Sequence, residues 1–504
     1  MLAGEPTFLA VDLGAESGRV LAACLKDGRV ELEEIHRFPN EPVKLNDGLH
    51  WDMLGIFAEV KEGLRKAGER VEGIESVGVD SWAVDFGLLD RDGALISNPH
   101  NYRDPRTEGM IERAFERVSK EEIYRTTGIQ FIRINTLYQL LAMENSPLLE
   151  IADSLLMIPD LICYWLTGRK ACEFTNATTT QLYDPEAGEW AWDLLERMSL
   201  PAHVFPEILP PATELGHLLP EVANELGFGE SFAVMTVGSH DTASAVVAVP
   251  AEGDDFAYIS SGTWSLAGVE TPEPIITQEA MDSNFTNEGG VGDRTRFLKN
   301  VMGLWLLQEC RKTWAEEGHE YSYDELERLA TEAPAFGPVV DPDHPAFFSP
   351  GDMPSRISSY CEKTGQEAPG SPGETARCVF ESLALKYQQV LEQAARLSGK
   401  SVETIHVVGG GSQNSLLCQI TADAAGLPVL AGPVEATALG NAMVQALAGG
   451  YLDSLEEIRA TVRRSYDVAR YEPEGDANEW EGQRERFRRL MDAGRIPVEG
   501  EENA

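Results

Sequence analysis

The chain has 504 residues, with 83 acidic and 41 basic side chains, and therefore carries a formal net charge of −42. This surplus disfavours binding to nucleic acid or to anionic lipid, because both require clustered Lys and Arg. The length predicts two large domains or three smaller ones, and the hydrophobic content of 43 % can fill more than one core.

The N-terminal segment and the longest apolar stretch do not suggest export or membrane insertion. No basic segment precedes the short apolar run of residues 1–14, and Asp12 ends that run. Residues 154–166 are apolar, but Pro159 and Asp160 interrupt them and the stretch is too short to span a bilayer. We expect a cytoplasmic protein without a membrane partner.

The seven cysteines form no CxxC pair and no Cys/His cluster with the spacing of a zinc site. Cys361 and Cys378 flank a Gly- and Pro-rich stretch across which they could meet. In a reducing compartment, free buried thiols are the expectation.

Strand patterns dominate the start of the chain. A small-residue turn over residues 14–18 separates the first two strands, and a hairpin over Lys26, Asp27 and Gly28 leads to the third. Strands are expected at 7–11, 19–25, 29–37 and 74–79, and a helix at 51–65. This mixture predicts an α/β protein.

A similar opening recurs in the second half, with strands expected at 256–260 and 264–269 around a turn at 261–263. Residues 249–255 interrupt the apolar pattern, so we expect two domains, 1–248 and 249–504. Residues 341–373, rich in Pro, Gly and Ser, predict an irregular surface excursion, and residues 472–504 predict a charged helix and an acidic tail.

Common nucleotide-binding motifs are absent. The nearest match to a P-loop is Gly399-Lys400-Ser401, but the first Gly of the motif is replaced by Ala394 and the segment ends a helix instead of starting one. The first turn contains no GxGxxG, so a dinucleotide-binding fold has no support.

Three glycine-containing turns, at residues 12–19, 260–265 and 407–414, remain as candidate ligand sites. The amides and hydroxyls of the first two can converge on an anion, and the third offers bare backbone at the start of a helix. A single turn of this kind is usually only a turn, but the set of three, with Asp12 closing the first strand, predicts a nucleotide site.

A fourth element, residues 237–245, places His240 and Asp241 where an apolar strand gives way to a helix. Asp241 is interpreted either as a helix cap or as a general base exposed at a strand end. His240 is interpreted with equal weight as a substrate ligand or as a hydrogen-bonded wall residue.

Together these elements resemble the FGGY carbohydrate kinases. The resemblance extends over nearly the whole chain and is carried by residues 10–20, 79–90, 102–107, 128–140, 174–184, 239–246, 260–266, 287–290, 298–309 and 432–441. It implies a two-lobed actin- and hexokinase-like (ribonuclease H-like) ATPase fold with the active site in the interlobe cleft.

The same resemblance implies transfer of the γ-phosphoryl group of MgATP to a sugar hydroxyl, with L-rhamnulose giving its 1-phosphate as the expected reaction. It assigns Asp241 as the general base and Asp12 and Asp241 to Mg²⁺. The ATP-binding set is Ala15, Glu16, Ser17, Gly18, Arg19, Thr263, Gln308 and Gly411, and the sugar-binding set is Ala83, His240, Asp241, Thr242 and Asn300.

From the polar residues near the implied pocket we add Asp85, Tyr102, Arg103 and Gln139 as weaker sugar-side candidates. Two positions depart from the family pattern. Ala83 stands where Gly is frequent, and Glu16 stands in the phosphate turn where Ser is common.

Two alternatives stay open. One is a kinase of the same family for another ketose, such as L-fuculose or L-xylulose, and the other is a non-catalytic nucleotide-dependent sensor. Small-molecule partners and a monomer or homodimer are expected in the kinase case.

Overall fold

A computed structural model describes residues 5–494, and these fall into two compact units. The first unit comprises the described residues up to 254, together with 270–299 and 435–467. The second comprises 255–269, 300–434 and the described residues from 468 onward. Neither unit is one continuous stretch, so this partition does not decide the domain boundary expected between 248 and 249, which stays a prediction.

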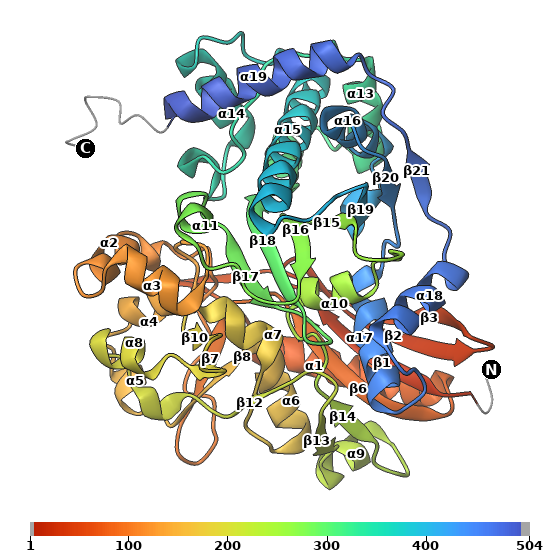
Figure 1. Cartoon of the computed structure of the whole chain (residues 1–504). Coiled ribbons are helices and arrows are strands. Elements are labelled where there is room, and N and C mark those ends of the chain that lie inside the picture. Colours follow the sequence, from red (N-terminus) through yellow and green to blue (C-terminus); the bar gives the residue numbers. More distant parts are fainter. Residues whose placement is uncertain (1–4, 495–504) are drawn as a thin grey trace. The chain divides into compact units, whose positions relative to one another are not determined.

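A six-stranded mixed sheet, in the order β13-β14-β6-β1-β2-β3, forms the centre of the first unit (Figure 1). β1 pairs antiparallel with β2 and parallel with β6, and all seven of its residues are buried. The strands are β1 (Thr7–Leu13), β2 (Ser17–Lys26), β3 (Arg29–Pro39), β6 (Ile74–Ser81), β13 (Glu214–His217) and β14 (Ala233–Met235). The predicted strand–turn–strand opening is therefore confirmed.

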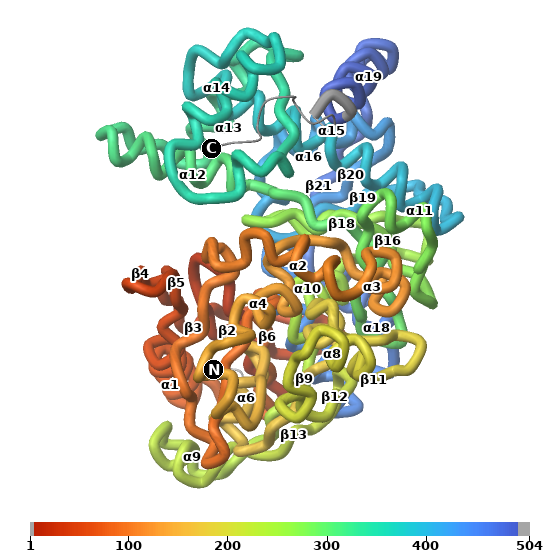
Figure 2. The backbone as a smooth tube through the Cα atoms, turned by 90° about the vertical axis from the view of Figure 1, so that its left-hand side faces the viewer, coloured from red at the N-terminus to blue at the C-terminus, as the bar shows by residue number. Residues whose placement is uncertain are grey.

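Helices pack on this sheet. α1 contacts β2 and β3 (Figure 2), and α17 contacts β1 and β6 (Figure 1). α1 begins after Asp52, whose side chain accepts a hydrogen bond from the Gly55 amide at 3.1 Å, and it buries Ile56, Val60 and Leu64 along one face. The helices are α1 (Met53–Arg70), α6 (Ile158–Thr167), α9 (Pro220–Leu226), α10 (Asp241–Val247), α17 (Ala436–Ala448) and α18 (Leu455–Ser465).

The first unit also contains short helices and strand pairs, several of which surround a second apolar core that includes Leu137, Tyr138, Leu155 and Leu195. They are β4 (Val43–Leu45), β5 (Gly48–His50), β7 (Phe86–Leu89), α2 (Met110–Phe115), α3 (Lys120–Thr127), α4 (Thr136–Ala142), α5 (Pro147–Glu150), β8 (Ser154–Met157), β9 (Cys172–Glu173), α7 (Phe174–Ala177), β10 (Tyr183–Asp184), β11 (Glu189–Trp190), α8 (Trp192–Arg197), β12 (Ile208–Leu209), α11 (Gln278–Asp282) and β17 (Thr286–Gly289).

The second unit contains a sheet in which β16, β15, β19, β20 and β21 are successive neighbours. Their bounds are β15 (Phe256–Ser261), β16 (Trp264–Thr271), β19 (Thr404–Val408), β20 (Val429–Ala431) and β21 (Ala469–Tyr471), and β18 (Thr295–Met302) runs from the first unit into the second. The helices are α12 (Trp305–Glu316), α13 (Tyr323–Glu332), α14 (Met353–Lys363), α15 (Pro372–Ser398), α16 (Ser415–Ala425) and α19 (Ala477–Gly494).

The structure corrects one expected element and supports two others. Residues 341–373 are not irregular throughout, because α14 lies within them and buries Met353, Ile357 and Tyr360. Its Pro354 sits in the first turn, where a missing amide hydrogen costs nothing. α15 ends at Ser398 and Gly399 follows in a left-handed conformation, which agrees with rejection of a P-loop there. The charged helix is α19, and the acidic tail lies outside the described residues.

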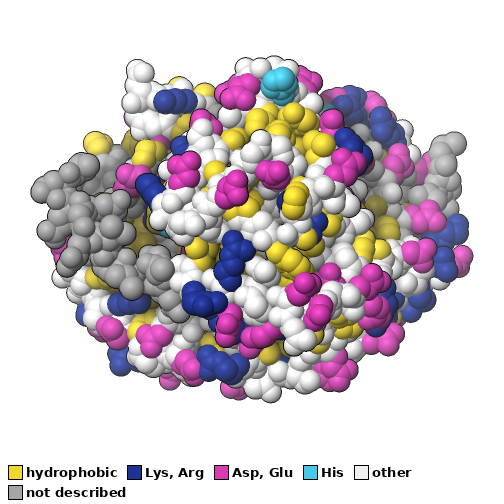
Figure 3. Space-filling model, turned by 90° about the horizontal axis from the view of Figure 1, so that it is seen from above, with side chains coloured by type: hydrophobic (Ala, Val, Ile, Leu, Met, Phe, Trp, Pro, Cys, Tyr) yellow, Lys and Arg dark blue, Asp and Glu magenta, His cyan; other side chains and the backbone are white. Residues whose placement is uncertain are grey.

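All seven cysteines are free and buried, as expected. The interaction between the Cys361 and Cys378 thiols lowers the pKa of Cys361 and raises that of Cys378. Within residues 5–494, no helix combines the length and the apolar character that crossing a bilayer demands. Acidic side chains are spread over much of the face shown in Figure 3, in line with the net charge of −42.

Candidate active site

The segment between β14 and α10 ends at an accessible carboxylate. Asp241 is the first residue of α10, and its Oδ1 accepts hydrogen bonds from the Thr242 amide at 2.5 Å and the Thr242 hydroxyl at 3.1 Å. One third of the Asp241 side chain (33 %) is exposed, so a ligand can reach it. Partial burial raises the pKa of Asp241, and the nearby charge of Asp12 adds to this rise.

Three aspartates gather at this end of the first sheet. Asp12 on β1 and Asp80 on β6 are register partners in neighbouring parallel strands. Asp80 is fully buried, and its pKa is raised well above the usual value by burial and by the charges of Asp12 and Asp241. Its Oδ2 accepts a hydrogen bond from Asn441 Nδ2 at 2.6 Å. Clustered carboxylate oxygens are the donors that Mg²⁺ prefers, and a cation there would offset the repulsion between them.

Arg19 lies beside this cluster. Its Nη2 donates to Asp12 Oδ2 at 2.5 Å, and its Nη1 pairs with Glu435. Arg19 lies on β2, directly after the small-residue turn, and its guanidinium neutralises part of the charge of the aspartate cluster. Of the other residues in this turn, Ala15 and Ser17 are half-buried, Glu16 is exposed and Gly18 is buried.

Ala83 lies between β6 and β7, next to a strained residue. Val84 has φ of 67°, a left-handed conformation that β-branched residues rarely adopt. The Val84 carbonyl accepts hydrogen bonds from Thr136 Oγ1 at 2.7 Å and from Gln139 Nε2 at 3.2 Å, and these hold the bend. Such strain is typical of functional sites, which fits a pocket wall at Ala83.

Asp85 organises this wall from inside. Its Oδ2 accepts from Trp51 Nε1 at 2.6 Å, Trp82 Nε1 at 3.0 Å and the Tyr102 amide at 3.1 Å, and its Oδ1 accepts from Gln139 Nε2 at 2.8 Å. The side chain is completely buried. Because four protein donors occupy its carboxylate, Asp85 supports the wall from behind, which argues against the expected direct contact with sugar.

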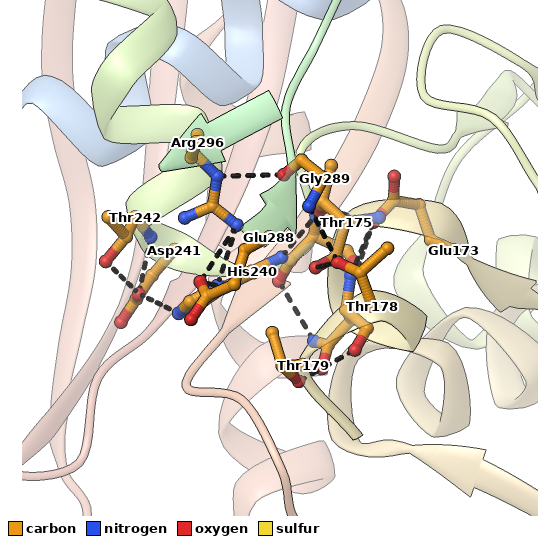
Figure 4. A network of polar contacts seen from close by, with 12 residues as sticks. Glu173, Thr175, Thr178, Thr179, His240, Asp241, Thr242, Glu288, Gly289 and Arg296 are labelled. Carbon is orange, nitrogen blue, oxygen red and sulfur yellow. Dashed lines mark hydrogen bonds and ion pairs between the residues drawn. The ribbon is translucent and has the colours of Figure 1, made fainter. Parts of the chain in front are cut away.

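His240 is held by the β17–β18 hairpin (Figure 4). Arg296 Nη2 lies 3.1 Å from His240 Nδ1, and Glu288 Oε2 lies 3.3 Å from the same atom. His240 Nε2 lies 3.4 Å from Asp241 Oδ1. The side chains of Arg296 and Glu288 are buried, whereas that of Asp241 is partly exposed. Both interpretations of His240 therefore retain support, because it is a bonded wall residue whose ring also faces Asp241.

The second unit brings three of the predicted nucleotide residues close to one turn. Gln308 Nε2 donates to Thr263 Oγ1 at 3.2 Å. Gly411 packs against Ser261 so closely that a Cβ at this position would lie 2.0 Å from Ser261 Oγ. Only glycine fits this approach, as the triple-glycine pattern predicts. Asn300 is a half-buried residue of β18 in the same unit.

The structure thus places each predicted residue in one of two local groups. The first unit holds those at positions 12, 15–19, 83 and 240–242, and the second holds those at 263, 300, 308 and 411. Sequence reasoning missed Asp80, Glu173, Glu288 and Arg296. The first three lie in or directly beside the motifs that carry the resemblance, but their burial and partners become visible only in three dimensions.

The two sheets with flanking helices define the mixed α/β fold of sugar kinases. Solved structures share it over most of the chain. The ligand-bound xylulose kinase from Lactobacillus acidophilus has a TM-score of 0.79 at 17 % identity, with 97 % of each chain covered. The glycerol kinase with ADP from Plasmodium falciparum has a TM-score of 0.73 at 15 % identity, covering 98 % of this chain and 99 % of that one.

The chain belongs to the FGGY family of carbohydrate kinases. The model of the family's N-terminal domain matches residues 7–248, and that of its C-terminal domain matches residues 257–449. The resemblance described from the sequence is therefore confirmed, and the chain is an ATP-dependent carbohydrate kinase.

Similar relatives share nearly the full length. The rhamnulokinase of Oceanobacillus iheyensis is 45 % identical over 465 residues, which are 92 % of this chain and 97 % of that one. The rhamnulokinase of Bacteroides thetaiotaomicron is 44 % identical over 479 residues, 95 % of this chain and 98 % of that one.

The burial of Asp85 predicts a specific pH dependence of stability. Desolvation raises its pKa from 3.8 to about 6 in the folded protein. As pH rises, Asp85 therefore ionises at a lower pH in the unfolded chain than in the folded protein. Ionisation of Asp85 then lowers the free energy of unfolding as pH rises from about 4 to about 6. Asp85→Asn removes this titration. Relative to wild type, its unfolding free energy in urea should increase by about 2 kcal/mol between pH 4.5 and pH 7. A constant difference in unfolding free energy between the variant and the wild type over this pH range would show that the pKa of Asp85 is not raised.

Proposed function

We propose that this chain transfers the γ-phosphoryl group of ATP to the 1-hydroxyl of L-rhamnulose, giving L-rhamnulose 1-phosphate and ADP. The full-length similarity to proteins named rhamnulokinase supports this choice of sugar. The observation that carries the chemistry is the accessible Asp241 carboxylate, which projects from the start of α10 beside Asp12.

Asp241 serves as the general base. It accepts the proton of the attacking hydroxyl while the preceding residue, His240, faces the same carboxylate. The raised pKa of Asp241 improves it as a proton acceptor, because a stronger base binds the proton more tightly. The carboxylate is partly buried and still reachable, and the buried side chains of Glu288 and Arg296 hold the neighbouring His240.

Asp12 and Asp241 are the residues proposed to hold Mg²⁺, and Asp80 lies behind them as a buried carboxyl group whose pKa is raised well above its usual value by burial and by its two acidic neighbours. When bound, Mg²⁺ would screen the phosphate charges of ATP. The turn from Ala15 to Arg19 and the hydroxyl of Thr263 supply phosphate contacts, and Gln308 and Gly411 supply nucleotide contacts. The Arg19 pairing with Asp12 positions a fixed positive charge at this turn.

On the sugar side we propose contacts from Ala83, His240, Asp241, Thr242 and Asn300. Ala83 adds a methyl group to a wall whose backbone is fixed through Val84 and Asp85. Tyr102, Arg103 and Gln139 stay secondary candidates. Small molecules are the proposed partners, a monomer or homodimer the proposed assembly, and the cytoplasm the proposed location, which the seven free thiols support.

A ketose panel tests the proposed reaction. With MgATP in excess, kcat/KM should be highest for L-rhamnulose among L-rhamnulose, L-fuculose and L-xylulose, and phosphorus NMR should identify the 1-phosphate. A higher kcat/KM for another ketose would replace the proposed substrate. Failure to phosphorylate any ketose would overturn the proposed reaction and favour a nucleotide sensor.

Replacing the base tests the role of Asp241. Asp241→Asn should retain the fold and ATP binding but lose turnover by about 10²–10⁴-fold, the usual contribution of general-base catalysis. Asp352→Asn is the matched control, because Asp352 also lies at a helix start and bonds only within its own first turn. Turnover above half the wild-type value in Asp241→Asn would remove Asp241 from this role.

A larger side chain at Ala83 tests the sugar wall. Ala83→Leu should raise the ketose KM at least 10-fold and leave the ATP KM within twofold, since only the sugar side gains bulk. Ala187→Leu, at an exposed turn, is the control and should change neither value. Equal rises in both KM values for Ala83→Leu would place Ala83 outside the sugar pocket.

A further inference from the structure

Glu173 is a buried carboxylate directly before the short helix α7. It is 2 % exposed, and its Oε2 accepts hydrogen bonds from the Thr175 amide at 2.9 Å, the Asn176 amide at 3.3 Å and Thr175 Oγ1 at 2.6 Å. This is the pattern of a helix N-cap. Glu is not among the residues preferred there, since Ser, Thr, Asp and Asn reach the first-turn amides with a shorter side chain.

The longer side chain of Glu173 also reaches a second segment. The same Oε2 accepts from the Ser239 amide at 3.1 Å and from Ser239 Oγ at 2.7 Å. Ser239 lies two residues before Asp241. Glu173 is 66 residues away from Ser239 in the chain. One oxygen therefore takes five donors from two segments. Burial raises the pKa of Glu173, and the hydrogen bonds from Thr175 and Ser239 oppose that rise because they favour the ionised carboxylate.

The remaining polar backbone atoms around Ser239 are also fixed. The His240 amide donates to Thr175 Oγ1 at 3.2 Å, and the Ser81 amide on β6 donates to the Ser239 carbonyl at 2.9 Å. Residues 175–180, which include four threonines, also contact β17: the Gly289 amide donates to Thr178 Oγ1 at 2.8 Å. Figure 4 shows this stretch between Glu173 and the residues His240 and Asp241.

We propose that Glu173 is a positioning residue for the reaction: its carboxylate fixes the backbone of Ser239 and His240 and thereby sets where the Asp241 carboxylate meets the sugar hydroxyl. The proposal rests on the proposed role of Asp241 and adds a residue that touches no substrate. A displacement of a reacting group by about 1 Å can cost 10²-fold in rate. Loss of the Glu173 contacts should thus act on turnover more than on nucleotide binding.

Glu173→Asp separates positioning from capping. Asp keeps the charge and is a preferred N-cap, but it is one methylene too short to hold both α7 and Ser239. We expect kcat to fall about 10–100-fold, the ATP KM to stay within twofold, and amide hydrogen exchange of Ser239 and His240 to become faster. Asp352→Glu is the matched control, because it changes an N-cap carboxylate by the same methylene at a helix start that bonds no second segment.

Ser239→Ala supplies a second route to the same contact. It removes the Ser239 Oγ donor and leaves α7 capped, so we expect kcat to fall at least threefold. Combined with Glu173→Asp, it should add little further loss, because both substitutions break one contact. If Glu173→Asp does not fold, Ser239→Ala alone decides the question, and wild-type kcat in Ser239→Ala then overturns the proposal.

The outcomes separate this proposal from the proposed function. Faster exchange at Ser239 and His240 with a reduced kcat supports positioning by Glu173. Unchanged exchange, or faster exchange with wild-type kcat, overturns it. Wild-type turnover in Asp241→Asn overturns the role of Asp241 instead, and the exchange data still show whether Glu173 holds the segment.

Discussion

Repulsion among three neighbouring carboxylates, those of Asp12, Asp80 and Asp241, is the constraint on which the first unit depends. The charge of Asp12 raises the pKa of both other groups. Two neighbours offset this cost, since Arg19 pairs with Asp12 and Asn441 donates to Asp80. Asn441 lies on α17, so the segment 435–467 returns to the N-terminal sheet and supports the site that the first strands begin. A phosphoryl-transfer enzyme gains from this arrangement, because concentrated negative charge attracts the cation that accompanies ATP.

Around this cluster, buried acidic side chains fix the loops that carry exposed functional groups. Asp85 accepts four hydrogen bonds behind Ala83, and Glu173 accepts five behind Ser239. Buried polar groups cost free energy unless they are bonded, and the hydrogen bonds that these two carboxylates accept favour one local geometry. Asp241 therefore combines an accessible carboxylate with a backbone that is held on several sides. The buried acids therefore hold the backbone, and Asp241 can be accessible without losing its position.

The sequence predicts features that depend on neighbours in the chain. The strands around the turn at 14–18, the acid at the end of β1, the helix that starts at Asp241 and the close glycine at 411 all follow from local patterns. Asp80, Glu173 and Arg296 could not be assigned a role in this way, because their partners lie on segments that the fold brings together. α14 was missed because Pro and Gly near its ends dominate the local pattern, although Pro354 suits a first helical turn. The sequence also does not predict that residues 435–467 belong to the first unit, because a helical pattern does not indicate the sheet on which the helix packs.

The most direct test of the account is the position of the sugar hydroxyl relative to Asp241. A crystal structure with L-rhamnulose and a non-hydrolysable ATP analogue measures the distance between the 1-hydroxyl oxygen and the nearest Asp241 carboxylate oxygen. The account predicts hydrogen-bond contact, at about 2.6–3.2 Å, with the Glu173–Ser239 contact intact. A 1-hydroxyl in contact with a different side chain, with Asp241 remote from every sugar oxygen, would contradict it.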